Sequence, residues 1–316
     1  MLDISLVIPI SPSSDERDLQ LLLESIANQT LTNLEVLIVA DGNCPLWARD
    51  ISMVNVLPSS GRRGASAARN HAARFSRAEI LGFLDDDVVL DSRWCEYAVA
   101  TFRDESVGGV SGKARVPLGQ YGLNYVPREL MWVMGGSYWD GDGMRVVPSV
   151  AGMNFCVRKS VFDESGGYDE SLGPAGDRPE AQRWHRLGAE EDDLAQKIQR
   201  NCRKKILFNP KMSVIHKLRP ETVSPGGLAK RSLHVGHNRA YIHARYPGTG
   251  MSSDRLALQS LVTTTILTTL SLSRHPLTAW ERLSFTAFVV ANLVLGYLVG
   301  FVRFRSAAHA NLSTGV

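Results

Sequence analysis

The sequence predicts an α/β fold with a mostly parallel sheet and helices on both of its faces. Short apolar strands alternate with helical segments through the first 90 residues, and this β-α-β-α-β order is typical of parallel sheets. Acidic residues directly follow two of the predicted strands. Because ligands of such sheets bind at the carboxyl ends of the strands, we expect a nucleotide or a diphosphate ligand there.

The predicted elements follow one another in a simple order. They are strand 4–9, helix 18–29, strand 34–39, helix 65–76 and strand 80–84. Leucine and isoleucine recur with helical spacing in the first helix, and the second helix is rich in alanine. The turn signal Ala40-Asp41-Gly42-Asn43 closes the second strand.

Composition limits the class of protein. The chain has 316 residues and a formal charge of +3, which is too small to indicate nucleic acid as a partner. Its four cysteines show no C-x-x-C spacing, which argues against a zinc ribbon or a disulfide framework. The N-terminus enters a strand without a basic segment, so we expect no signal peptide. The catalytic part is therefore expected in the cytoplasm.

Three consecutive aspartates, Asp85, Asp86 and Asp87, follow the third strand. Their mutual repulsion is costly unless a cation or a basic partner balances it. Carboxylate oxygens suit hard cations such as Mg²⁺ and Mn²⁺, which also bind diphosphate oxygens. The sequence thus favours a metal site here, with a solvated acidic turn as the alternative.

A second acidic run, Glu190-Glu191-Asp192-Asp193, opens a predicted helix. The preference of helix N-termini for negative charge would explain one or two of these residues, but not four. One of them, with a raised pKa, could take a proton from an attacking hydroxyl. Further on, His216 stands at the end of an apolar stretch, where a histidine is more often structural than a metal ligand.

The C-terminal part differs in character. Segments 256–272 and 283–302 contain no charged residue, and the second has about the 20 residues that a membrane-spanning helix needs. Arginines flank this second segment. A buried helical hairpin is the alternative. The sequence thus suggests three parts: a catalytic domain (1–220), a connecting segment (221–254) and C-terminal hydrophobic helices that associate with a membrane (255–316).

The motifs together resemble the family 2 glycosyltransferases with a GT-A fold. The similarity covers about residues 4 to 218 and rests on six motifs in the order typical of that family. These are Leu6-Val7-Ile8-Pro9, Ala40-Asp41-Gly42-Asn43, Ala68-Arg69-Asn70, Asp85-Asp86-Asp87, Gly166-Gly167-Tyr168-Asp169 and the acidic run from Glu190 to Leu194.

The resemblance implies a role for each matching residue. Asp41 would read the nucleobase, Asp87 and His216 would hold Mn²⁺ or Mg²⁺, and Glu191 would be the catalytic base. The remaining donor-binding residues would be Pro9, Arg69, Asn70, Asp85 and Asp86, and the acceptor-binding residues Gly152, Asn154 and Glu190.

Two positions depart from the family's pattern. The family usually has aspartate where this chain has Glu191, so Asp192 remains open as the base. The first strand ends in Ile10-Ser11-Pro12 where many members have a Thr-Tyr-Asn-like sequence, so we expect the contacts to the nucleobase to differ there.

The implied function is metal-dependent transfer of a sugar, with inversion, from a nucleoside diphosphate sugar to a hydroxyl of a glycan or lipid-linked acceptor. The expected location is the cytoplasmic face of the cell membrane, in synthesis of cell-envelope glycans. Two alternatives stay open at this point: a non-catalytic nucleotide-sugar-binding protein, and a nucleotidyltransferase on a similar sheet.

Overall fold

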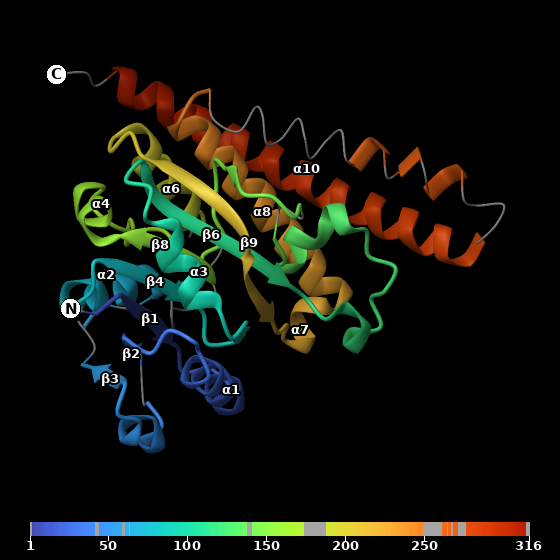
Figure 1. Ribbon diagram of the computed structural model, residues 1–316. Coiled ribbons are helices and arrows are strands. Elements are labelled where there is room, and N and C mark those ends of the chain that lie inside the picture. Colours follow the sequence, from blue (N-terminus) through green and yellow to red (C-terminus); the bar gives the residue numbers. More distant parts are fainter. Residues whose placement is uncertain are drawn as a thin grey trace. The chain divides into compact units, whose positions relative to one another are not determined.

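A computed structural model describes the protein in two compact units (Figure 1). The units are Met1–Arg115 with Trp139–Lys217, and Val116–Tyr138 with Leu218–Val316. The described residues are 2–41, 44–58, 61–62, 64–137, 141–173, 188–248, 261–263, 265–266, 268–270 and 276–313. Gly42 and Asn43 of the predicted turn, and much of the apolar segment 256–272, lie outside them. The domain boundaries at 220 and 254 stay predictions.

The first unit is built on a mixed sheet. In the described part of the chain it has nine strands in the order β3-β2-β1-β4-β8-β6-β9-β5, and β7 pairs with β9. The strands are β1 (Ile4–Ile10), β2 (Leu34–Ala40), β3 (Val54–Leu57), β4 (Ile80–Leu84), β5 (Val88–Leu90), β6 (Val107–Arg115), β7 (Arg145–Val146), β8 (Asn154–Arg158) and β9 (Lys205–His216). The first four are parallel, whereas β8 lies antiparallel between β4 and β6.

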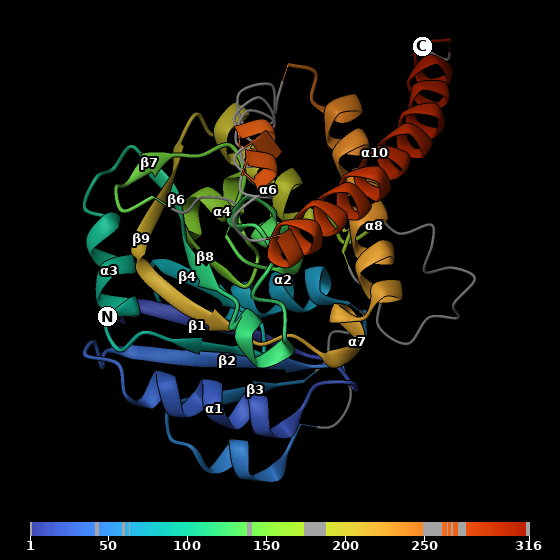
Figure 2. The same ribbon diagram turned by 90° about the vertical axis from the view of Figure 1, so that its right-hand side faces the viewer.

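Helices cover both faces of this sheet, as predicted. Because side chains of a strand alternate between faces, Leu6 and Ile8 belong to one core cluster and Val7 to another. The first cluster includes side chains of α1 (Glu16–Ala27) and α3 (Trp94–Thr101), and the second those of α2 (Ala65–Phe75), α4 (Lys159–Glu164) and α6 (Glu190–Arg200). Figure 2 shows α1 on the side of the sheet away from α2.

The strand register brings the ends of the strands to one edge. Ile10 at the end of β1 pairs with Ala40 at the end of β2, so Asp41 follows directly at that edge. On the other side of β1, Val7 pairs with Phe83 in β4, so the aspartate triplet begins two residues later, directly after Leu84. Both acidic positions therefore lie at the carboxyl ends of the parallel strands.

The second unit is helical. Its principal elements are α7 (Pro220–Val223), α8 (Pro225–Arg245) and α10 (Pro276–Ser313). Its core combines apolar residues of α8 and α10 with those around the short helical turn Arg128–Met134. Among the described residues, one helix, Leu277–Phe304, is long and apolar enough to cross a membrane, and its most apolar 18 residues have a mean hydropathy of 2.1. It contains the predicted segment 283–302.

Candidate active site

The end of β4 and the end of β9 bring an aspartate and a histidine together. Strand β5, immediately after the aspartate triplet, pairs antiparallel with β9, and Val88 lies opposite His216. The backbone N–H of Lys217 donates to the carbonyl of Asp87 at 2.9 Å. As a result, His216 Nε2 lies 3.5 Å from Asp87 Oδ1. The two residues predicted to hold a metal are thus neighbours in the fold.

A buried arginine forms the centre of a second cluster. Arg69, at the start of the second turn of α2, is 2% exposed, and its Nη2 lies 2.6 Å from Asp85 Oδ1. Its Nη1 lies 3.8 Å from Glu190 Oε1 and 3.9 Å from Glu191 Oε1. Burial alone would lower the pKa of Arg69, but the nearby negative charges, first that of Asp85, raise it above its usual value. The guanidinium therefore stays charged and holds three carboxylates.

The two glutamates at the start of α6 have raised pKa values. Burial is the largest cause for Glu191, and the negative charge of Glu190 is the second. Burial also raises the pKa of Glu190, while Arg69 opposes that rise. A carboxylate whose pKa is raised is a better proton acceptor near neutral pH than an exposed one. This cluster can therefore accept a proton from a hydroxyl that enters it.

A glycine makes room for Glu191. A Cβ atom built on Gly152 would lie 2.1 Å from Glu191 Oε1 and 2.6 Å from its Cγ. Gly173 is similar, because its φ of +88° favours glycine and a Cβ there would lie 3.1 Å from Glu190 Cδ. Both glutamates thus lie against backbone that carries no side chain.

Asp41 and Asn70 are held by local hydrogen bonds. Asp41 Oδ2 accepts from the backbone N–H of Gly64 at 2.7 Å, which ties the end of β2 to the residue before α2. Asn70 donates to the carbonyl of Tyr168 at 2.9 Å and accepts from its N–H at 2.9 Å. Asn70 therefore fixes the Gly166–Glu170 segment on α2. Pro9 lies within β1, partly buried and paired with Val39.

Tyr168 is a site residue that sequence reasoning missed. Its buried ring lies 5.3 Å from the guanidinium carbon of Arg69. An aromatic face at that distance stabilises a cation. The sequence did point to this residue, because Tyr168 belongs to the Gly166-Gly167-Tyr168-Asp169 motif. A tyrosine at that position, however, is equally compatible with a place in the hydrophobic core.

Asn154 lies in the core of the sheet. Its side chain is fully buried; Oδ1 accepts from Trp94 Nε1 at 2.8 Å, and Nδ2 donates to the carbonyls of Met212 and Lys113 at 3.0 and 3.2 Å. These bonds join β8 to α3, β6 and β9. Because its amide is used inside the protein, Asn154 is better placed to support the site than to contact an acceptor.

The remaining acidic residues differ in their surroundings. Asp193 is fully buried and pairs with Lys197 Nζ at 2.8 Å, one helical turn later. Asp192 and Asp86 are partly buried. Successive residues of a helix point about 100° apart. Asp192 therefore points in a different direction from Glu191, and Glu191 is the one that contacts the arginine cluster.

The Asp87–His216 pair fits a divalent cation. Asp87 Oδ1 is buried and accepts no hydrogen bond in the described part of the chain. A carboxylate oxygen and an imidazole nitrogen are both ligands that Mn²⁺ accepts. The described residues contain no group of three or more His, Cys, Asp or Glu side chains arranged for a metal. Two protein ligands would leave further positions for water and phosphate oxygens, a common arrangement for Mg²⁺.

Comparison with known proteins decides the family. Residues 5–166 match the family described as glycosyl transferase family 2, which is more than half of the chain. The chain belongs to this family. It is therefore a glycosyltransferase, and the predicted family and enzyme class are confirmed. Neither a non-catalytic binding protein nor a nucleotidyltransferase is supported by this match.

Two kinds of relative agree with the assignment. A "glucosyl-dolichyl phosphate glucuronosyltransferase" of Haloferax volcanii is 28% identical over 239 residues, which are 71% of this chain and 72% of the relative. Among solved structures, a mannosyltransferase from Pyrobaculum calidifontis in complex with GDP-Man and Mn²⁺ has a TM-score of 0.58 at 16% identity, covering 94% of this chain and 87% of its own.

A second solved structure shows the same fold. GalNAc-T7 with UDP, GalNAc and Mn²⁺ has a TM-score of 0.53 at 20% identity, covering 78% of this chain and 51% of its own. The GT-A fold predicted for this glycosyltransferase is thus confirmed. Both structural neighbours contain Mn²⁺, which is consistent with a divalent metal.

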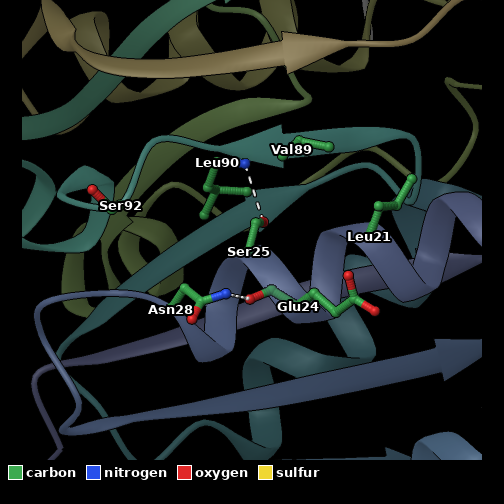
Figure 3. A pocket seen from close by; sticks show the side chains of 7 residues that line it. All are labelled: Leu21, Glu24, Ser25, Asn28, Val89, Leu90 and Ser92. Atoms are coloured by element: carbon green, nitrogen blue, oxygen red, sulfur yellow. Dashed lines mark hydrogen bonds between the residues drawn. The ribbon is translucent and has the colours of Figure 1, made fainter.

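A surface pocket lies elsewhere in the first unit of the glycosyltransferase. Figure 3 shows its lining side chains, which come from α1 and from β5 and the turn after it. Ser25 Oγ accepts from the N–H of Leu90 at 3.1 Å there, joining the two elements. The pocket contains none of the predicted site residues and only one charged residue, Glu24. Ser25 thus joins α1 to the sheet, while Asn28 donates to the carbonyl of Glu24 in its own helix.

Proposed function

We propose that this glycosyltransferase moves a sugar from a nucleoside diphosphate sugar to a hydroxyl of a glycan or lipid-linked acceptor, with inversion, in one displacement. The observation that carries this proposal is the buried cluster in which Arg69 holds Asp85, Glu190 and Glu191 at one edge of the sheet. It combines a fixed positive charge with a carboxylate of raised pKa. Displacement at an anomeric carbon needs both a proton acceptor and charge compensation.

Glu191 is the proposed base. Its carboxylate would accept the proton of the acceptor hydroxyl as the oxygen attacks the sugar from the face opposite the leaving diphosphate. Its raised pKa and its position against Gly152 support this role over Asp192. Glu190, which is 3% exposed, would keep the pKa of its neighbour high through its own charge.

The donor would occupy the strand ends. Asp41 would accept a hydrogen bond from the nucleobase of the donor. Asp85 would lie near the ribose and diphosphate, held there by Arg69. A divalent cation bound by Asp87 and His216 would supply neutralisation of the charge that develops on the leaving diphosphate. Mn²⁺ and Mg²⁺ both satisfy this chemistry, and the bound metal of the structural neighbours favours Mn²⁺.

A lipid-linked acceptor at the cytoplasmic face of the membrane suits the second unit. The Haloferax relative is described as acting on glucosyl-dolichyl phosphate, and the apolar helix Leu277–Phe304 would bring the enzyme to such a substrate.

The test is a screen of nucleotide sugars for diphosphate release with and without Mn²⁺, followed by the two base variants. Glu191→Gln should lower kcat by roughly 10²-fold or more with little change in donor affinity. Asp192→Asn serves as the matched control and should retain most activity. If Asp192→Asn is the impaired variant instead, the base is assigned to the wrong residue. If neither is impaired, the acidic run serves only the helix terminus.

A further inference from the structure

Helices α8 and α10 of the second unit are packed backbone to backbone. A Cβ built on Gly236 would lie 2.0 Å from the carbonyl oxygen of Leu293, and one built on Gly296 would lie 2.0 Å from that of Leu233. Contacts this close exist only where both helices present glycine at the crossing. The two helices lie side by side in both views (Figures 1 and 2). They therefore behave as one pair.

The contacts also fix how far α8 runs along α10. Leu233 lies at Gly296, and Ala240 lies at Gly300. The ring of Tyr241 lies 5.4 Å from that of Phe304. Beyond the glycine crossing, the contacts of Ala240 and Tyr241 lie farther along α10, so the two helices run in the same general direction. Helix α8 thus accompanies the C-terminal half of the apolar stretch Leu277–Phe304.

Helix α8 cannot accompany α10 into hydrocarbon. It contains four basic side chains, Lys230, Arg231, Arg239 and Arg245, together with three histidines and no aspartate or glutamate. Burial and the nearby charges of Arg231 and Lys230 lower the pKa of His234, a sign of concentrated positive charge. An arginine or lysine at a bilayer centre is costly even on the most permissive scales.

The face of α10 turned away from its partner is apolar. Phe285, Val289, Gly296 and Gly300 are buried on one side of the helix. The exposed residues between 284 and 302 include one polar side chain, Ser284, and many large apolar ones, such as Val302 at 70% exposure. The pair thus combines a long apolar face with a basic helix that is attached to it over most of its length.

We propose that the α8–α10 pair lies in the plane of an anionic phospholipid surface, with α10 immersed at the acyl boundary and α8 at the phosphates, so that α10 does not span the bilayer. Apolar burial and attraction to anionic lipids together drive this type of binding. The proposal refines the membrane association proposed above. A perpendicular α10 would carry the basic residues of α8 into the hydrocarbon layer, whereas an in-plane pair leaves them at the headgroups.

Topology tests the proposal directly. Single cysteines are introduced by Thr278→Cys and Ser306→Cys, before and after the charge-free segment 283–302, into the full chain, whose four native cysteines are buried. Sealed membrane vesicles are then treated with an impermeant maleimide. We expect both positions to be labelled from the cytoplasmic side only, with the unsubstituted chain as the unlabelled control. Labelling from opposite sides means that α10 spans the bilayer, which overturns the proposal.

Charge dependence tests the role of α8. The double variant Lys230→Gln/Arg245→Gln removes two exposed charges, and we expect roughly 30-fold weaker binding to phosphatidylglycerol-containing vesicles, about fivefold per charge. Binding to phosphatidylcholine vesicles should change little. The matched control Arg103→Gln/Lys211→Gln removes two exposed charges of the first unit and should bind as the unsubstituted chain does.

The results separate this inference from the proposed membrane association. Equal losses in both double variants, or no loss in either, contradict the headgroup contact of α8. A full chain that stays in solution as a defined oligomer, with no affinity for either vesicle, shows that a second copy covers α10 and removes both proposals. Sugar transfer to a soluble acceptor is measured in parallel, because it depends on neither.

Discussion

Replacing Gly152 by alanine tests whether Glu191 is the base and whether its position matters. A Cβ on Gly152 would lie 2.1 Å from Glu191 Oε1, whereas ordinary contacts begin at 3.4 Å, so the carboxylate must move by about 3.4 minus 2.1, or 1.3 Å. Rotation of the carboxylate alone does not relieve the contact, because Glu191 Cγ would be only 2.6 Å away. Gly152 is not among the described glycines with positive φ, so alanine introduces no backbone strain.

A displacement of about 1 Å in a reacting group can cost 10²-fold in rate. We therefore expect Gly152→Ala to lower kcat by roughly that factor while the KM for the donor stays nearly constant. The assay is the initial rate of diphosphate release at saturating acceptor. Gly143→Ala is the matched control, because a Cβ at Gly143 would meet nothing within 4 Å.

A double variant separates a specific effect from a general loss of structure. If Gly152 acts through Glu191, then Gly152→Ala should slow the Glu191→Gln enzyme little further, since the base is already lost. If kcat of the double variant falls by the product of the two single-variant factors, the two residues act independently. A folded Gly152→Ala enzyme with a kcat within about threefold of the parent would refute the reasoning about position.

Three further perturbations concern the same site. Asp87→Ala should abolish Mn²⁺-dependent turnover and weaken Mn²⁺ binding measured by calorimetry, without unfolding the chain; near-normal metal-dependent transfer would contradict the metal assignment. Arg69→Met leaves three carboxylates without their cation, and loss of one partner of a buried ion pair costs about 3–5 kcal/mol, so urea unfolding should show a large drop in stability. Glu190→Gln removes the charge that, after burial, raises the pKa of Glu191. Because the base acts deprotonated, the acid limb of kcat/KM should move to lower pH, and an unchanged limb would show that the two glutamates are uncoupled.

The part of the fold that sequence predicts well is the part with continuous apolar runs. Strands β1, β2 and β4 are such runs, and their buried side chains alternate between two cores. The sequence does not predict strand β6, because the strand begins with Val-Gly-Gly-Val-Ser-Gly, a composition typical of loops. Its glycines are required by close packing: a Cβ on Gly109 would lie 2.8 Å from the ring of Phe155, and one on Gly112 would lie 2.1 Å from the carbonyl of Met212.

The same limit applies to the site. Acidic residues at the ends of β2 and β4 can be read from the chain, because strand ends and ligand sites coincide in parallel sheets. The pairing of Asp87 with His216 follows only from the family resemblance and not from the residues themselves, since it depends on β5 turning back along β9. The surroundings of Asn154 are likewise invisible in the sequence. A polar residue near a motif suggests a ligand contact, but its amide instead joins three carbonyl or indole groups of the core.

The glutamate in place of the usual aspartate and the glycine at 152 are best understood as a matched pair. The two are distant in sequence, yet the side chain of Glu191 rests where a side chain of residue 152 would be. An aspartate at 191 would draw the carboxylate back by about 1.5 Å, the length of one carbon–carbon bond. Its distance from Arg69 Nη1, now 3.9 Å, would then exceed the range of an ion pair. The longer side chain therefore reaches the arginine that balances its charge, and the missing side chain at Gly152 gives it the path to do so.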